Sequence, residues 1–245
     1  MKSAPKGCWQ LMIAALVFCM AGSLTAAGGD FWAKKPYQQW SAEETQRMME
    51  ESPWATTLKL SGIQSAVTSG DSPNNRGYRG EMETDPSISY NLQFRSAQPI
   101  REAQVRSSQI NARYDKMSTE QKAAFDVNAE KFLAVTFPDR VVVSVTFHSN
   151  VQGYESALRG YWASESMAKL SMSVYLNTKT ERLALTNYSF KDDTFQFTFP
   201  RPKQVQPDEK ISVEFVHPRI NVIGQQRVLQ EFSLKKMLVN SAPAF

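Results

Sequence analysis

Apolar and polar residues alternate in several short stretches of the chain. This period of two is typical of a strand that buries one face. The clearest example is the run Ile88, Tyr90, Leu92 and Phe94. From Leu170 onward the pattern is wholly β. We expect strands near residues 57–60, 88–94, 140–148, 170–176, 182–188, 194–199, 210–216 and 228–238.

Helical spacing is confined to the first two-thirds of the chain. Ser41 fits an N-cap, because two glutamates follow it in the first turn, and Ser52-Pro53 ends that helix. Ser118 and Gln121 have the spacing of a capping box. The expected helices cover 41–52, 99–114, 118–133 and 154–162. The third carries one apolar face, made of Phe125, Ala129, Phe132 and Leu133.

This segregation of helices and strands predicts an α+β fold. Hairpin-length connections between the last strands favour a mainly antiparallel sheet. We expect N-terminal helices to pack against the inner face of this sheet, which would be curved or form part of a barrel. Residues 28–245 would form a single α+β domain, with a long polar loop at 68–86 whose role the sequence leaves open.

The N-terminal residues have the three parts of a signal peptide. Lys2 and Lys6 are followed by an apolar run at 11–20 and by small residues at 21–29. The apolar run is too short to cross a hydrocarbon layer about 30 Å thick. We therefore expect residues 1–27 to be removed on export, leaving a periplasmic or secreted protein. Cleavage one residue earlier fits nearly as well.

Cys19 leaves a second kind of processing open. The sequence Leu16-Val17-Phe18-Cys19 has the shape of a lipoprotein site, which would anchor the protein to a membrane, although the bulky Phe18 opposes it. Cys8 and Cys19 are the two cysteines of the chain. The mature protein would therefore contain neither a disulfide nor a thiolate metal site.

The charge of the mature chain argues against a nucleic-acid partner. Removing Lys2 and Lys6 from the 28 basic residues leaves 26 against 24 acidic ones, a net charge of +2. These basic residues are spread along the sequence rather than clustered. No electrostatic footprint of nucleic-acid binding is present.

The sequence contains no standard catalytic, metal or cofactor motif. His148 and His217 are the two histidines, and each lies near the end of an expected strand. Together with an acid they could bind zinc, but the His-Glu-x-x-His spacing is absent. The Gly-x-Ser-x-Gly elbow, the phosphate loop and the dinucleotide fingerprint are absent too. We expect a non-catalytic protein that binds a protein partner or a small ligand and needs no cofactor. A hydrolase using His148 or His217 and a carrier of an apolar ligand are the alternatives.

Aromatic residues are the most suggestive candidates for a binding site. Trp32, Trp40, Trp54 and Trp162 could line a pocket for an apolar or sugar-like ligand. The same side chains would also suit the core of a domain without disulfides.

Four segments of the mature chain carry a resemblance. They are Trp40 with the Glu-rich helix into Ser52-Pro53-Trp54-Ala55, Ser96 to Arg101, Phe197 to Arg201, and Phe232 to Met237. In these segments the chain resembles a group of uncharacterised bacterial exported proteins with a β-rich C-terminal third. The resemblance implies export and a single domain, and it implies no catalytic residues.

Overall fold

The computed structural model describes residues 31–61, 85–239 and 242–245. The expected signal peptide and nearly all of the expected loop at 68–86 lie outside the described residues. Contacts divide the chain into the units Met1–Phe31 and Trp32–Phe245, and the second unit contains the elements discussed below. None of the helices in the described residues is long and apolar enough to span a membrane.

Local signals in the sequence define the helices. Ser41 and Glu44 close a capping box at the start of α2, and Ser118 and Gln121 close another at the start of α4. Pro99 occupies the first turn of α3. The α-helices are α1 (Phe31–Lys34), α2 (Ala42–Glu50), α3 (Gln98–Asn111), α4 (Thr119–Ala134), α5 (Tyr154–Ser164) and α6 (Met167–Leu170), and the 3-10 turns are η1 (Tyr37–Gln39), η2 (Tyr114–Lys116) and η3 (Leu234–Lys236).

The strands form separate antiparallel sheets, which confirms the α+β class. One sheet has the order β1-β2-β3-β7-β6, a second has the order β5-β4-β8-β9, and β10 pairs with β11. The strands are β1 (Ala55–Ser61), β2 (Ser87–Phe94), β3 (Arg140–Ser149), β4 (Tyr175–Asn177), β5 (Arg182–Ala184), β6 (Asn187–Lys191), β7 (Thr194–Pro200), β8 (Lys210–His217), β9 (Gln226–Ser233), β10 (Leu238–Val239) and β11 (Ala242–Pro243).

Three expected strands differ from the structure. The stretch 170–176 begins at the end of α6, and only its last two residues belong to β4. Leu170 and Val174 are buried four residues apart and are joined by a helical backbone hydrogen bond of 2.8 Å, whereas Met172 is 73% exposed. The apolar spacing that suggested a strand at 170–176 is therefore that of a helical turn, which buries residues four apart. The stretch 182–188 divides between β5 and β6, in different sheets, and 228–238 ends as a strand at Ser233.

The two larger sheets face each other across an aromatic core. The ring of Tyr90 on β2 lies 5.3 Å from that of Phe215 on β8, and the ring of Phe94 lies 4.9 Å from that of Phe232 on β9. Trp162 of α5 stacks on Phe195 of β7 at 4.0 Å. The inner face of the five-stranded sheet therefore packs on the second sheet and α5, rather than on the N-terminal helices as expected.

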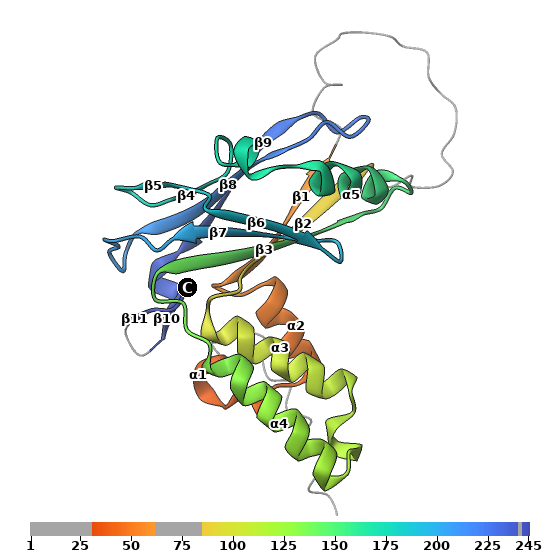
Figure 1. Ribbon diagram of the computed structural model, residues 1–245, viewed down its shortest axis with the longest axis vertical. Coiled ribbons are helices and arrows are strands. Elements are labelled where there is room, and N and C mark those ends of the chain that lie inside the picture. The colour runs from red at the N-terminus through yellow and green to blue at the C-terminus, as the bar shows by residue number, and fades with distance from the viewer. Residues whose placement is uncertain (1–30, 62–84, 240–241) are drawn as a thin grey trace, which may run out of the picture. The chain divides into compact units, whose positions relative to one another are not determined.

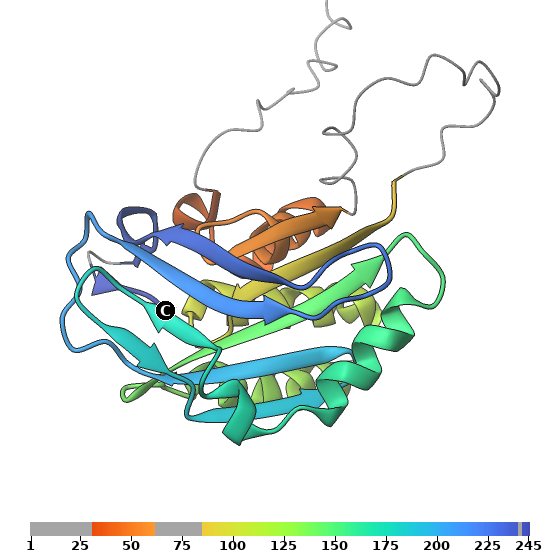
Figure 2. The ribbon, with the colours of Figure 1, turned by 90° about the horizontal axis from the view of Figure 1, so that it is seen from above.

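Helices α2, α3 and α4 lie on the other side of the five-stranded sheet (Figure 1). The outward-facing Asn91 and Gln93 of β2 both donate to the carbonyl oxygen of Met49 at the end of α2, at 3.1 and 2.9 Å. In Figure 2 the four-stranded sheet lies in front, and α3 and α4 lie behind the strands. The helices therefore form a layer of their own on this side of the sheet (Figures 1 and 2).

Candidate ligand-binding groove

Helix α4 buries none of its residues, all of which are described. Its apolar face is the expected one, but Phe125 and Leu133 are only half-buried and Phe132 is 39% exposed. Large apolar side chains such as phenylalanine and leucine are more often buried in a protein than left accessible. The face of α4 is therefore left open.

Arg101 of α3 fixes the C-terminal end of α4. Its Nη1 donates to the carbonyl oxygens of Phe132, Leu133 and Val135, and its guanidinium lies 5.4 Å from the centre of the Phe137 ring. The last carbonyls of a helix have no partner within the helix, so a buried arginine can satisfy several at once. This clamp sets the position of α4 relative to α3.

The N-terminal half of α4 is held by a second polar contact. The hydroxyl of Tyr114 donates to both carboxylate oxygens of Asp126, at 2.9 and 2.7 Å. The hydrogen bond to this carboxylate raises the pKa of Tyr114. The ring of Tyr114 also meets that of Phe125 edge-on at 5.4 Å. Polar contacts therefore fix α4 near its middle and at its C-terminal end.

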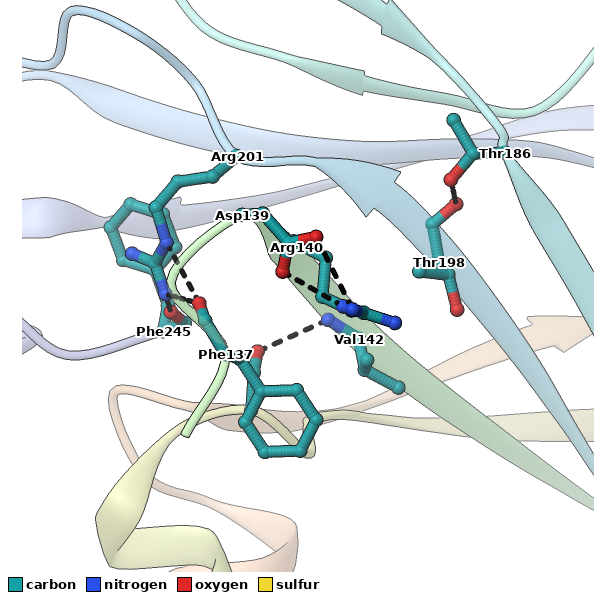
Figure 3. Close-up of polar contacts among 9 residues, drawn as sticks. Phe137, Asp139, Arg140, Val142, Thr186, Thr198, Arg201 and Phe245 are labelled. Atoms are coloured by element: carbon teal, nitrogen blue, oxygen red, sulfur yellow. Dashed lines mark hydrogen bonds and ion pairs between the residues drawn. The ribbon is translucent and has the colours of Figure 1, made fainter. Parts of the chain in front are cut away.

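The segment after α4 is fixed to the sheet by Arg201 (Figure 3). Its Nη2 donates to the carbonyl oxygens of Phe137, at 3.0 Å, and of Phe245, whose ring lies 5.3 Å from the guanidinium. Close by, the backbone N–H of Val142 donates to Oγ of Ser96 at 3.1 Å. Ser96 belongs to the turn between β2 and α3, so this turn is also held in place.

A groove of about 590 Å³ opens between α2, α3 and α4. This volume lies within the range of about 300–1,000 Å³ found for small-molecule sites. Its walls are mainly apolar and aromatic, with amides, hydroxyls and one arginine among them. The lining residues are Met49, Arg95, Gln104, Val105, Ser107, Ser108, Phe125, Asn128, Ala129 and Phe132.

Two polar side chains in the groove have donors without acceptors. Burial lowers the pKa of Arg95, and no described residue offers its guanidinium a hydrogen bond or an ion pair. The Nε2 atom of Gln104 is buried and likewise has no partner among the described residues. Neither residue stands out in the sequence, since no spacing or motif marks an arginine that will lack a partner.

A smaller hollow of about 290 Å³ lies at the C-terminal end of α3. It is lined by three cationic residues, Arg106, Arg113 and Lys116, together with Tyr114 and Asp115 among others. Arg106 is already bound, because its Nε donates to the carbonyl oxygen of Trp40 at 2.8 Å and its Nη1 to Gln109 at 3.2 Å. Its apolar lining is smaller than that of the groove.

The structure does not gather the four expected tryptophans into one pocket. Trp40, Trp54 and Trp162 are fully buried, and Trp32 meets Trp54 edge-on at 5.8 Å. Trp162 lies between the facing sheets. None of the four lines either hollow. Their role as ligand contacts stays a prediction, and their packing is that of a core.

The two histidines lie on opposite sides of the five-stranded sheet. His148 faces outward, with its side chain 80% exposed, and pairs with Glu155. His217 is fully buried on the inner side, where its Nδ1 lies 2.8 Å from the hydroxyl of Tyr90. Burial lowers the pKa of His217 to about 4. No group of three or more metal-binding side chains occurs within the described ranges.

Fold and groove together describe an α+β protein with two facing antiparallel sheets and a separate helical layer. No protein-family model matches this chain, and no curated protein matches it. A solved structure from Burkholderia pseudomallei K96243, described as a novel protein of unknown function, is similar over 58% of this chain and 73% of its own. The two sequences are 10% identical and the TM-score is 0.39. No conclusion about the fold or the function of this protein is based on this similarity.

Proposed function

We propose that the protein is an exported, non-catalytic binding protein that holds an apolar ligand in the groove between α2, α3 and α4. The observation that carries the proposal is the open apolar face of α4, on a helix that polar contacts fix near its middle and at its C-terminal end. An apolar surface left accessible on a fixed scaffold is typical of a binding site. Export rests on the pattern of residues 1–27 in the sequence.

The chemistry of the groove supports binding rather than catalysis. A serine nucleophile needs an adjacent base. Ser107 and Ser108 line the groove, but the hydroxyl of Ser108 donates to the carbonyl oxygen of Gln104 in its own helix, at 2.9 Å. The ten described lining residues include neither a histidine nor a carboxylate. A ligand would therefore meet apolar walls and hydrogen-bond donors, without a group that could take up a proton.

Fluorescence titration with N-phenyl-1-naphthylamine, a neutral apolar probe, tests the proposal. We expect enhanced emission with the wild-type protein and its loss in Ala129→Trp, because the indole would fill the groove. Ala124→Trp is the matched control, since Ala124 is an exposed residue of the same helix that does not line the groove. Circular dichroism would verify that each variant folds.

A second variant covers the case in which Ala129→Trp does not fold. Phe132→Ser removes an apolar wall of the groove at a partly exposed position and should weaken probe binding about tenfold or more. If the wild type fails to bind the probe, or if both groove variants bind it as the wild type does, the proposal is wrong.

A further inference from the structure

We propose that the ligand of this groove is a long-chain monocarboxylate whose carboxylate pairs with Arg95 and accepts a hydrogen bond from Gln104. The inference rests on the proposed function and names the chemical class of the ligand. It depends on two donors that lack acceptors and on the charge of the groove lining.

Arg95 differs from the other enclosed arginines of this protein. Arg101 donates to three backbone carbonyls, and Arg201 donates to two. A guanidinium has five N–H donors in a planar fork, and this fork matches the two oxygens of a carboxylate. Arg95 is half-buried in the groove and has no such partner within the described part of the chain, so its donors are open to an acceptor supplied by a ligand.

Gln104 supplies a second donor in the same groove. Leaving a buried N–H without an acceptor costs free energy. The buried Nε2 of Gln104 would recover part of that cost by donating to an anionic oxygen. A carboxylate can accept from an arginine fork and from an amide at once, because its two oxygens have about four acceptor positions.

The charge of the lining favours a monoanion. Of the ten described residues that line the groove, Arg95 alone is charged. One cation neutralises one carboxylate, whereas a phosphate monoester would bring nearly two negative charges. The apolar walls formed by Val105, Phe125 and Phe132 would cover a hydrocarbon chain, and each methylene buried there would strengthen binding. The complementary ligand is therefore an acid head on an apolar tail.

Displacement of N-phenyl-1-naphthylamine by dodecanoate and by dodecan-1-ol at pH 7.5 measures how much the carboxylate contributes to binding beyond the hydrocarbon chain. The two compounds share one chain length and differ in charge. In the wild type we expect dodecanoate to displace the probe at a concentration at least tenfold lower than dodecanol. Arg95→Met should abolish this preference, so that dodecanoate and dodecanol displace the probe at similar concentrations.

Further variants make the test specific. Gln104→Leu should reduce the preference several-fold and covers the case in which Arg95→Met does not fold. Arg113→Met is the matched control, because it removes a cation from the neighbouring hollow and should keep the preference. Thermal melting of the ligand-free protein gives an independent measurement. Arg95→Met should not lower the melting temperature, since the charge it removes has no partner.

The possible failures can be told apart. If the probe binds but dodecanol and dodecanoate displace it equally, the carboxylate inference is wrong and the proposed function stands. Stronger displacement by dodecyl phosphate than by dodecanoate would also overturn the monocarboxylate assignment. If the probe does not bind the wild type, the proposed function fails and the inference fails with it.

Discussion

The pairing of Tyr90 with His217 predicts that the protein loses stability in mild acid. His217 is enclosed between the two facing sheets, where one ring nitrogen lies 2.8 Å from the Tyr90 hydroxyl. The other, Nε2, is buried without a partner among the described residues. Protonation would place a charge in the low-dielectric interior between the sheets. Burial therefore lowers the pKa of His217 in the folded protein to about 4 from an ordinary value of 6.5.

The size of the effect follows from this shift. Between pH 6.5 and pH 4 the unfolded chain binds a proton at this histidine and the folded protein does not, so the free energy of unfolding falls as the pH falls. A difference of one pKa unit corresponds to about 1.4 kcal/mol. The shift of His217 therefore predicts a loss of about 3 kcal/mol, with the full stability present above pH 6.5.

Urea unfolding at intervals between pH 7.5 and pH 4.5 would measure the loss. Carboxylates also titrate near the lower end of this range, so the wild type should be compared with His217→Gln, whose amide stays neutral and can still pair with Tyr90. The stability advantage of the wild type over this variant should shrink by about 2–3 kcal/mol across the range. A constant difference would refute the assignment of the effect to His217.

Two further predictions concern the core and the N-terminus. Trp162→Ala should lower the free energy of unfolding by about 3–5 kcal/mol, because it removes a fully buried indole stacked on Phe195, whereas Phe132→Ala on the exposed face of α4 should cost less than about 1 kcal/mol. Urea unfolding measures both, and equal losses would contradict the burial argument. Mass determination of the protein from its native envelope should give a mature chain that begins at Gly28 and carries no lipid. A lipid on Cys19 would place the protein on a membrane surface instead.

Elements with a strong local signal could be predicted from the sequence. The capping boxes at Ser41 and Ser118 are made between residues three apart, so the chain fixes these helix starts without long-range contacts. The alternation in 88–94 and 140–148 likewise predicted β2 and β3 with the correct buried faces. Both kinds of signal depend on a period that a single segment displays.

The arrangement of the strands could not be predicted in this way. β3 pairs with β7, although α5, α6, β4, β5 and β6 lie between them in the sequence. Hairpin spacing in the last third suggested one continuous sheet, yet β4 and β5 belong to one sheet and β6 and β7 to the other. Register between distant strands depends on which faces meet in the core, and no local pattern encodes that choice.

The candidate groove shows the same division between local and long-range information. The sequence identifies the apolar face of residues 118–133, but amphipathicity alone cannot tell whether a partner covers it. Exposure of that face depends on where Arg101 and Tyr114 hold α4. The missing acceptor of Arg95 depends on every residue that folds around it.

The positions of the aromatic residues give a physical reason to seek the ligand at α4 rather than at the tryptophans. Both cysteines lie within residues 1–27, so burial of apolar surface must stabilise residues 28–245 without a disulfide. Trp40, Trp54 and Trp162 are fully buried and already serve that purpose. A ligand that displaced one of them would cost the core several kcal/mol before any gain. Phe132, by contrast, is 39% exposed, so a ligand that covers it gains apolar burial and the core loses none.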